Sequence, residues 1–364
     1  MNVKRIVSMA AAAAVFISSA GFSAFAADGI KINKKNFPDE KFRKYVVRHA
    51  DFNYDGRLSE EEAESMTKMQ IIDGSTRSLK GIEYFTELEE LLCHGLSLES
   101  LDLTGNAKLV RVSCEKNSIT NLDISKCTAL KYLNCSKNQL TELDLSNNKE
   151  LRSLDCSENQ LDELDVSKNP ELVSLYCSFN GFKKLDISKN TKLSSLNCSY
   201  NSLTKLDVSK QTKFISLYCN YNQIEKLDLR KNKNLENLDC SNNLLKGLDL
   251  SNNNKLEFLK CGSNHLTSLD LSKNAAMEWP PKSFERSILF KCDGNEFSIN
   301  AKVGETYSLS ELQKYGFDPK IARNWKGAEY DERTNSIKIT EKTVTYLYDC
   351  TKGRIVKFTL FPKS

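Results

Sequence analysis

Histidine is scarce in this chain of 364 residues. Only three occur: His94 and His265 lie at opposite ends of a long repeat, and His49 precedes it. The zinc-protease, nucleophile-elbow and phosphate-loop patterns are also missing from the sequence. Without a base that can be placed beside a nucleophile, we expect no enzymatic activity.

An excess of one charge is missing as well. The chain has 52 Lys and Arg against 48 Asp and Glu, and loss of a leader carrying Lys4 and Arg5 would leave 50 against 48. Nucleic-acid binding needs a clustered basic face, so this balance argues against a nucleic-acid partner. Evenly spread charge is typical of a well-solvated, elongated surface.

Long apolar runs are limited to one, from Ile6 to Phe22. Two basic residues precede it and Ala24-Phe25-Ala26 follows, which is the order of a secretory signal peptide. We expect residues 1–26 to be removed and the mature protein to be secreted, with no membrane span left. The alternative is an uncleaved membrane anchor, which the Ala/Ser-rich run and the cleavage pattern disfavour.

Cysteine, in contrast, is plentiful, and twelve cysteines in an exported chain would ordinarily suggest a disulfide scaffold. Their spacing argues otherwise, because only Cys127, Cys292 and Cys350 fall outside a strict period of 21 residues. The periodic members are Cys93, Cys114, Cys135, Cys156, Cys177, Cys198, Cys219, Cys240 and Cys261.

The 21-residue period belongs to a longer pattern, L-x-x-L-x-C-x-x-N-x-L-x-x-L-D-L-S-x-N, which holds from about Leu88 to Asn274. In one unit the pairs Leu133/Cys135 and Leu143/Leu145 alternate with polar residues, which places each pair on the inner face of a short strand. The pattern predicts a mainly β solenoid with two short parallel strands per coil, stacked at ~4.8 Å. One coil cannot bury its own apolar face, so the core exists only as a stack.

Three polar series accompany the leucines and the periodic thiols. An asparagine at the turn after the first strand (Asn117, Asn138, Asn159, Asn180, Asn201, Asn222, Asn243, Asn264) is expected to bond to backbone groups of adjacent coils. A second asparagine series follows the second strand and is interrupted by Cys127 and Gln211. We interpret the periodic thiols as small buried hydrophobes, since thiols ~4.8 Å apart along one axis form neither a tetrahedral metal site nor easy disulfides.

The third series is an outward aspartate ladder: Asp102, Asp123, Asp144, Asp165, Asp186, Asp207, Asp228, Asp249 and Asp270. Stacked carboxylates repel one another unless hydroxyls, turn amides or lysines offset the charge. We expect structural hydrogen bonds here, and a calcium ladder is the alternative.

These repeats resemble the leucine-rich repeat family, and in particular its nested 21-residue bacterial class sometimes called IRREKO. The resemblance covers about half of the chain, residues 79–278 in our division, and departs from the family where Cys takes an inward position usually held by Leu.

Residues 51–62, within a predicted helical cap over 27–78, match the calcium loop of an EF-hand. Its expected oxygen donors are Asp51, Asn53, Asp55, the Arg57 carbonyl, Ser59 through water, and Glu62. Gly56 permits the sharp bend between them. We expect a structural Ca²⁺ ion; the alternatives are a metal-free helical cap and a dockerin, although a dockerin has two such loops.

Residues 279–364 contain strand-like runs over 287–291, 336–340, 344–348 and 355–361, and a short helical stretch over 309–315. They predict a small β-rich, sandwich-like module that closes the stack. Cys292 and Cys350 are candidates to pair across it. The order helical cap, solenoid and immunoglobulin-like module resembles the internalin layout of bacterial surface proteins, and this resemblance implies ligand binding by the first-strand face.

Aromatic residues cluster on that face. Phe179, Tyr200 and Tyr221 share one position in three successive coils, and Tyr176 and Tyr218 precede two of the cysteines. Such clusters anchor protein or glycan ligands, although a purely structural aromatic ladder is an equal alternative. The sequence therefore predicts a monomeric, secreted, adhesin-like binding protein, retained non-covalently at a cell surface if at all. A purely structural surface or matrix protein and a host-protein-binding effector are the alternatives.

Overall fold

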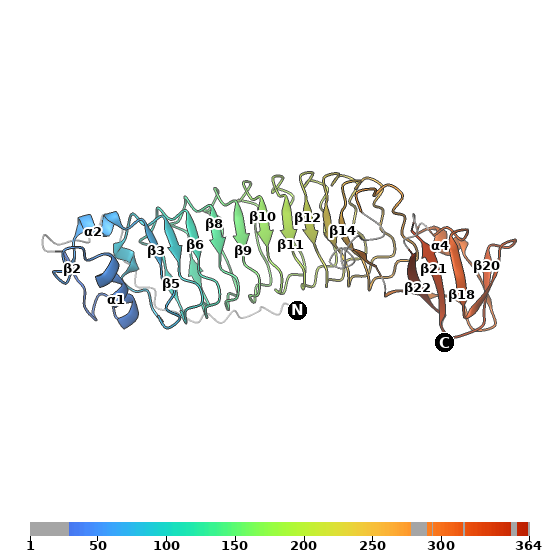
Figure 1. Ribbon diagram of the computed structural model, residues 1–364, viewed down its shortest axis with the longest axis horizontal. Coiled ribbons are helices and arrows are strands. Elements are labelled where there is room, and N and C mark those ends of the chain that lie inside the picture. The colour runs from blue at the N-terminus through green and yellow to red at the C-terminus, as the bar shows by residue number, and fades with distance from the viewer. Residues whose placement is uncertain (1–28, 278–289, 293, 316, 351–354, 363–364) are drawn as a thin grey trace, which may run out of the picture.

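The computed structural model describes residues 29–277, 290–292, 294–315, 317–350 and 355–362. The predicted signal peptide lies outside these residues. The described chain forms a long stack of coils with helices at its N-terminal end and a β-rich module at its C-terminal end (Figure 1). None of the helices in this described part is both long and apolar enough to cross a membrane.

The first strand of every coil joins one parallel sheet of eleven strands. From β4 to β14, adjacent strands pair one repeat apart, with Leu133 opposite Leu154 and Leu154 opposite Leu175, so each inward apolar side chain stacks on the next. The predicted parallel solenoid is confirmed. The sheet consists of β3 (Lys68–Gln70), β4 (Glu90–Leu92), β6 (Arg111–Ser113), β8 (Tyr132–Asn134), β9 (Ser153–Asp155), β10 (Ser174–Tyr176), β11 (Ser195–Asn197), β12 (Ser216–Tyr218), β13 (Asn237–Asp239), β14 (Phe258–Lys260) and β15 (Phe290–Lys291).

The predicted second strand is wrong for most coils. Among the described residues, only β5 (Leu101–Asp102) and β7 (Leu122–Asp123) pair on the side opposite the long sheet. In the other coils the alternating residues are still buried and exposed as predicted; for example, Leu143 and Leu145 are buried and Asp144 is exposed. Burying alternate side chains needs only an extended backbone, whereas a ladder also needs neighbouring backbones at bonding distance. Hydrophobic alternation therefore predicted the inward face but not the pairing.

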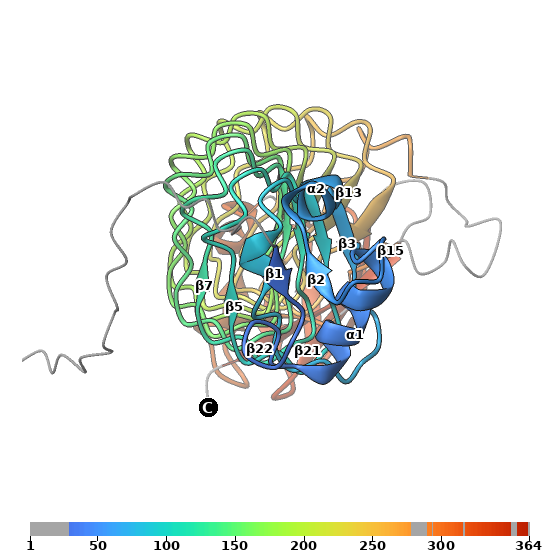
Figure 2. The same ribbon diagram turned by 90° about the vertical axis from the view of Figure 1, so that its left-hand side faces the viewer.

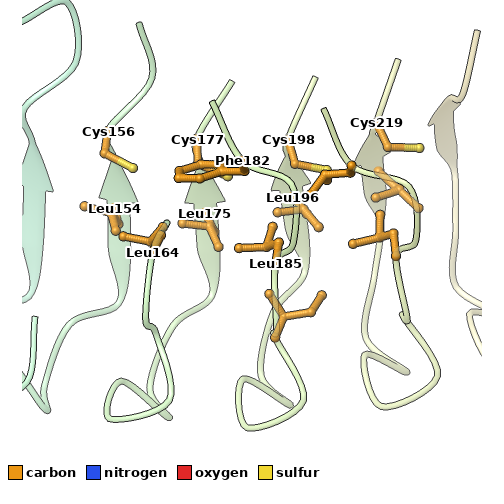
Figure 3. Packing of buried hydrophobic residues seen from close by; sticks show 14 of the residues in the cluster. Leu154, Cys156, Leu164, Leu175, Cys177, Phe182, Leu185, Leu196, Cys198 and Cys219 are labelled. Carbon is orange, nitrogen blue, oxygen red and sulfur yellow. The ribbon is translucent and has the colours of Figure 1, made fainter. Parts of the chain in front are cut away.

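The core is a continuous column between these two sides. Leucines of the sheet face leucines of the opposite segments, and the periodic cysteines line the column along one edge (Figure 3). Every periodic cysteine is fully buried, which confirms their inward position. Burial raises the pKa of Cys114 and Cys198 to about 12. These thiols are therefore protonated and unreactive at neutral pH.

Both asparagine series bond the coils to one another. Asn138 donates from Nδ2 to the carbonyls of Cys114 (3.0 Å) and Cys135 (3.1 Å), and its Oδ1 accepts from the Ile119 N–H (3.0 Å). In the second series, Asn148 donates to Ile124 O (3.1 Å) and Cys127 O (2.9 Å). The expected bonds to adjacent coils are confirmed.

The last rung of the column departs from prediction. β15 pairs in parallel with β14, which brings Cys292 beside Cys261, and the two form a disulfide. The predicted partner Cys350 is instead a buried thiol. Cys292 is thus a tenth ladder position, displaced in the sequence because its coil is 31 residues long rather than 21.

The N-terminal cap contains α1 (Glu40–His49) and α2 (Glu60–Ser65). Asp39 caps α1 by accepting from Lys41 N and Phe42 N, and Ser59 caps α2 in a reciprocal capping box with Glu62. A short antiparallel pair of strands, β1 (Ile30–Lys31) with β2 (Arg57–Leu58), and a 3₁₀ turn, η1 (Ile82–Tyr84), complete the cap.

The cap packs directly on the first coil. Phe37, Phe42, Ile82 and Phe85 are buried in the same core cluster as the first leucines of the stack. β3 belongs to the long sheet although it falls within the residues predicted as cap, so the sheet begins before the repeat pattern becomes recognisable.

The C-terminal module has a four-stranded sheet of β16 (Asn295–Ile299), β22 (Ile355–Pro362), β21 (Val344–Asp349) and β18 (Ala322–Lys326). A three-stranded sheet contains β17 (Thr306–Ser308), β20 (Ser336–Ile339) and β19 (Ala328–Asp331). The short helix α4 (Ser310–Gln313) connects β17 to β18 along the chain. The predicted strands over 336–340, 344–348 and 355–361 are present. Packing of the sheets as an immunoglobulin-like sandwich stays a prediction.

Candidate ligand-binding face and calcium loop

The aromatic residues occupy a recurrent backbone position. The second residue after each periodic cysteine has φ near +55° in eight successive coils: Lys116, Lys137, Glu158, Phe179, Tyr200, Tyr221, Asn242 and Ser263. Side chains rarely adopt this left-handed region, and aromatic ones are poorly suited to it. The coil-to-coil backbone bonds hold it, for example Tyr200 N to Asn220 O at 2.9 Å. Three aromatic side chains are thereby presented in one orientation.

The three rings form a stack along the solenoid. The ring centroids of Phe179 and Tyr200 are 4.0 Å apart with planes at 10°, and those of Tyr200 and Tyr221 are 4.2 Å apart at 14°. Despite this contact the side chains remain 49%, 39% and 45% exposed. The prediction that they lie on the exposed sheet is corrected: they lie in the turn that leaves each strand, at the rim of the sheet.

Tyr176 and Tyr218 do lie on the sheet, at the ends of β10 and β12, with Asn197 of β11 between them in register. Both tyrosines are half-buried. Val173 and Ile215, which are 39% and 43% exposed, stand just before the same strands. We call the surface formed by Val173, Ile215, Tyr176, Tyr218, Phe179, Tyr200 and Tyr221 the aromatic face.

A polar hollow adjoins the aromatic face. It has a volume of about 360 Å³ and its walls include Tyr200, Tyr221, Asp239 and Lys260. The Asp239 carboxylate is held by the Ser241 N–H (3.1 Å) and hydroxyl (2.6 Å). Asp239 and Lys260 were not predicted as site residues. They share the position of Tyr176 and Tyr218 directly before the cysteine, so the repeat register was the signal that pointed to them.

The predicted calcium loop lies between α1 and α2 as expected. Asp51 accepts from Asp55 N (3.1 Å) and Gly56 N (3.1 Å), and Asn53 Oδ1 accepts from Asp55 N (2.9 Å). Glu62 reaches back across the loop, where Oε1 accepts from Phe52 N (2.8 Å). These bonds wrap the loop around its acidic side chains.

The first and last acidic residues of the loop are buried. Asp51 and Glu62 are only 3% and 6% exposed, and neither forms an ion pair with any basic residue in the described part of the chain. Within the same residues, no three His, Cys, Asp or Glu side chains are gathered as a metal cluster, since the loop carboxylates turn to backbone amides instead. Two buried carboxylates that no basic side chain neutralises, in a loop whose other expected donors are oxygens, fit a hard divalent ion.

The aspartate ladder has a different arrangement. Each carboxylate accepts from the backbone N–H two residues later, as in Asp144 to Ser146 (2.8 Å) and Asp186 to Ser188 (2.8 Å). The expected structural hydrogen bonds are thus present. They lower the pKa of Asp144 and Asp186, and the Arg230 side chain lowers the pKa of Asp228 to about 2.

Residues 37–169 match the family model for the leucine-rich-repeat domain of the endo-beta-N-acetylglucosaminidase EndoS. The chain is also similar to the internalin InlF from Listeria monocytogenes, with 22% identity over 75% of this chain and 87% of that one and a TM-score of 0.59. The chain has a leucine-rich-repeat fold.

Two further solved structures are similar. The leucine-rich effector YopM from Yersinia pestis shares 22% identity over 72% of this chain and 68% of that one, with a TM-score of 0.52. The functional domain of InlJ from Listeria monocytogenes, described as including a cysteine ladder, shares 25% identity over 92% and 98%, but its TM-score of 0.38 is too low to argue from. No curated protein sequence matches the chain significantly.

Proposed function

We propose that this protein is a secreted or surface-associated, non-catalytic binding protein that captures a protein or glycan through the aromatic face. The observation that carries the proposal is the stack of Phe179, Tyr200 and Tyr221, which keeps 39–49% of each side chain exposed. Exposed aromatic area is costly to leave in water and is the commonest anchor material of interfaces. The rigid turn also holds the rings in place before binding, which limits the entropy lost on association.

The surroundings support an interface better than a structural ladder. A ladder needs only the rings, whereas the aromatic face continues onto the strands through Tyr176 and Tyr218 and ends in the polar hollow. An apolar centre with a polar margin is the usual composition of a binding site. A purely structural surface protein remains the second candidate, because ring stacking itself stabilises neighbouring coils.

The test replaces Phe179, Tyr200 and Tyr221 by Ser in the full chain. Capture from panels of host proteins and glycans should be lost, while the thermal midpoint changes little because the rings are not in the core. The matched control places Ser at Lys116, Lys137 and Glu158, which have the same left-handed position in three earlier coils. If the aromatic variant captures the same partners as the wild type, or loses stability instead of capture, the ladder is structural.

We further propose that Ca²⁺ binds residues 51–62 and stiffens the cap, with Asp51, Asn53, Asp55, the Arg57 carbonyl, Ser59 and Glu62 as its donors. A single loop without a partner loop suggests a dissociation constant of ~10⁻⁴ to 10⁻³ M. The loop contains β2, and β2 pairs with β1, which precedes the loop in the chain. The strand of the loop therefore has its pairing partner within this chain.

Calcium at about tenfold its dissociation constant should stabilise the cap by about 1.4 kcal/mol. Thermal unfolding with calcium and with chelator measures this effect, and Glu62→Gln should remove the calcium-dependent part. Glu64→Gln, which alters an exposed carboxylate of the same helix outside the loop, is the control. Equal midpoints with calcium and with chelator would exclude the stabilising role.

A further inference from the structure

The side of the solenoid opposite the sheet carries a charge pattern that neither ligand capture nor calcium binding uses. In the coils from Glu99 to Lys226, two exposed positions lie between the inward apolar residues, and one buried leucine separates them from the ladder aspartate. In two successive coils these positions hold Glu142, Asp162 and Glu163, and in the next two they hold Lys183, Lys184 and Lys205. The sign of the surface therefore reverses between one coil and the next, near the middle of the stack.

These six charges have no ion-pair partner among the residues that the structure describes. All six side chains are exposed, and none forms an ion pair with another described residue. The ladder aspartates do not account for the reversal, because they run through both halves alike. Elsewhere at this boundary, Lys192 Nζ lies 2.6 Å from Glu171 Oε1, so an acidic residue of one coil forms an ion pair with a basic residue of the next.

The turns at the end of these segments extend the basic half. Lys189 and Lys210 are exposed at the same position of two successive coils, and Lys231 continues the row. Lys168 occupies this position in the acidic half and reduces its charge. A shallow hollow of about 1170 Å³ crosses the boundary. Its walls include Glu142, Asp162 and Glu163 on the acidic side and Lys184 and Lys189 on the basic side, and the ladder aspartates from Asp123 to Asp186 line both sides.

In place of the monomer expected from the sequence, we propose that a second copy of this chain docks antiparallel on this side, with a two-fold axis at the boundary between the acidic and basic coils. The axis places Asp162 and Glu163 of each copy opposite Lys183 and Lys184 of the other, and Glu142 opposite Lys205. A two-fold interface must be self-complementary, and a surface whose charge inverts about its centre has that property. A polyanion would match only the basic half and would leave the acidic half without a partner.

The pairing keeps the proposed binding surface open. The sheet and the segments with the charge reversal lie on opposite sides of the leucine column (Figures 2 and 3). The strands that carry Tyr176 and Tyr218 would therefore face away from the interface, and the rings of Phe179, Tyr200 and Tyr221 lie at the rim between the two sides. A dimer would present two copies of the aromatic face. The facing hollows keep the ion pairs hydrated, so the association should be sensitive to salt.

The experiment measures the mass of the full mature chain by sedimentation equilibrium at low and high ionic strength. The wild type should be dimeric at low salt and dissociate at high salt. D162K/E163K and K183E/K184E should each weaken self-association by about tenfold or more. An equimolar mixture of these two variants should form a 1:1 heterodimer, because the four charges nearest the axis are then all basic in one variant and all acidic in the other.

K131E/R152E serves as the matched control, since it reverses two basic residues on the sheet side and should dimerise like the wild type. A monomer at all salt and protein concentrations overturns the proposal. So does a mixture of the two reversed variants that fails to associate. Wild type that remains monomeric but binds heparin in a manner abolished by K183E/K184E would assign the basic half to a polyanion instead.

Discussion

At the scale of single residues, buried asparagine amides hold neighbouring coils together. Members of the first series use both the nitrogen and the oxygen, so Asn138 has four coil-to-coil or turn bonds. Members of the second series donate twice, but buried oxygens such as Asn148 Oδ1 and Asn169 Oδ1 have no partner among the described residues. The first series is therefore the better satisfied of the two.

Adjacent residues of one turn allow a direct measurement of such a bond. Asn148→Ala removes donors to Ile124 O and Cys127 O at a fully buried site and should lower the free energy of unfolding by about 1–3 kcal/mol. Asn147→Ala, at the exposed neighbouring position, should change it by less than about 0.5 kcal/mol. Urea unfolding of both variants checks the difference, and equal effects would contradict a role for the buried amide.

Single residues were also where prediction from the sequence failed. The inward cysteines and both asparagine series followed from the period, whereas Cys292 was placed outside the ladder because its coil is 31 residues long. The local pattern was nevertheless present: Asn295 follows Cys292 by three residues and donates to its carbonyl at 2.7 Å, as the corresponding asparagine does in the coils from Cys114 to Cys261. A search for the local motif rather than the fixed interval would have found it.

At the scale of elements, the segments opposite the sheet are stabilised by the ladder carboxylates. The backbone N–H and hydroxyl of the following serine lower the pKa of Asp144, Asp165 and Asp186 below the usual 3.8. The ionised carboxylates therefore stabilise the folded chain above pH 3.8, and this stabilisation is lost as the pH falls through the lower folded pKa values. The loss extends down to about 2 for Asp228.

Thermal midpoints of the wild type should consequently fall as the pH drops below 3.8. In D144N/D165N/D186N the fall should be shallower, because three of the titrating groups are gone. Unfolding scans across this acidic range measure both slopes. An unchanged slope in the triple variant would show that the ladder carboxylates contribute nothing to stability.

Elements also show what a hydrophobic pattern can and cannot predict. The helices around the calcium loop were predicted because their caps, Asp39 and Ser59, are local signals. β3 was not predicted, because Met69 and Ile71 replace the usual leucine and cysteine at the junction with the cap. The second strands were overpredicted, because alternation specifies a buried face and leaves backbone pairing open.

At the scale of the whole molecule, the ends of the stack are covered by other parts of the chain. The Tyr346 hydroxyl of the C-terminal module donates to Thr267 O of the last coil at 2.6 Å, and Leu271 N donates to Cys350 O at 3.1 Å. An uncovered end coil would expose apolar core. Periodicity predicted the stack, but the aromatic packing of Phe317, Tyr346 and Phe358 in the module has no periodic signal to reveal it.

The central claim is that equal coils hide their leucines and thiols in one column, which aligns the aromatic face. Mass-spectrometric thiol labelling of the native protein tests it directly. The periodic cysteines from Cys93 to Cys240 should stay unmodified until the chain is unfolded, and Cys261 should be recovered joined to Cys292. Labelling of those thiols in the folded protein, or disulfides between neighbouring rungs from Cys93 to Cys240, would contradict the column.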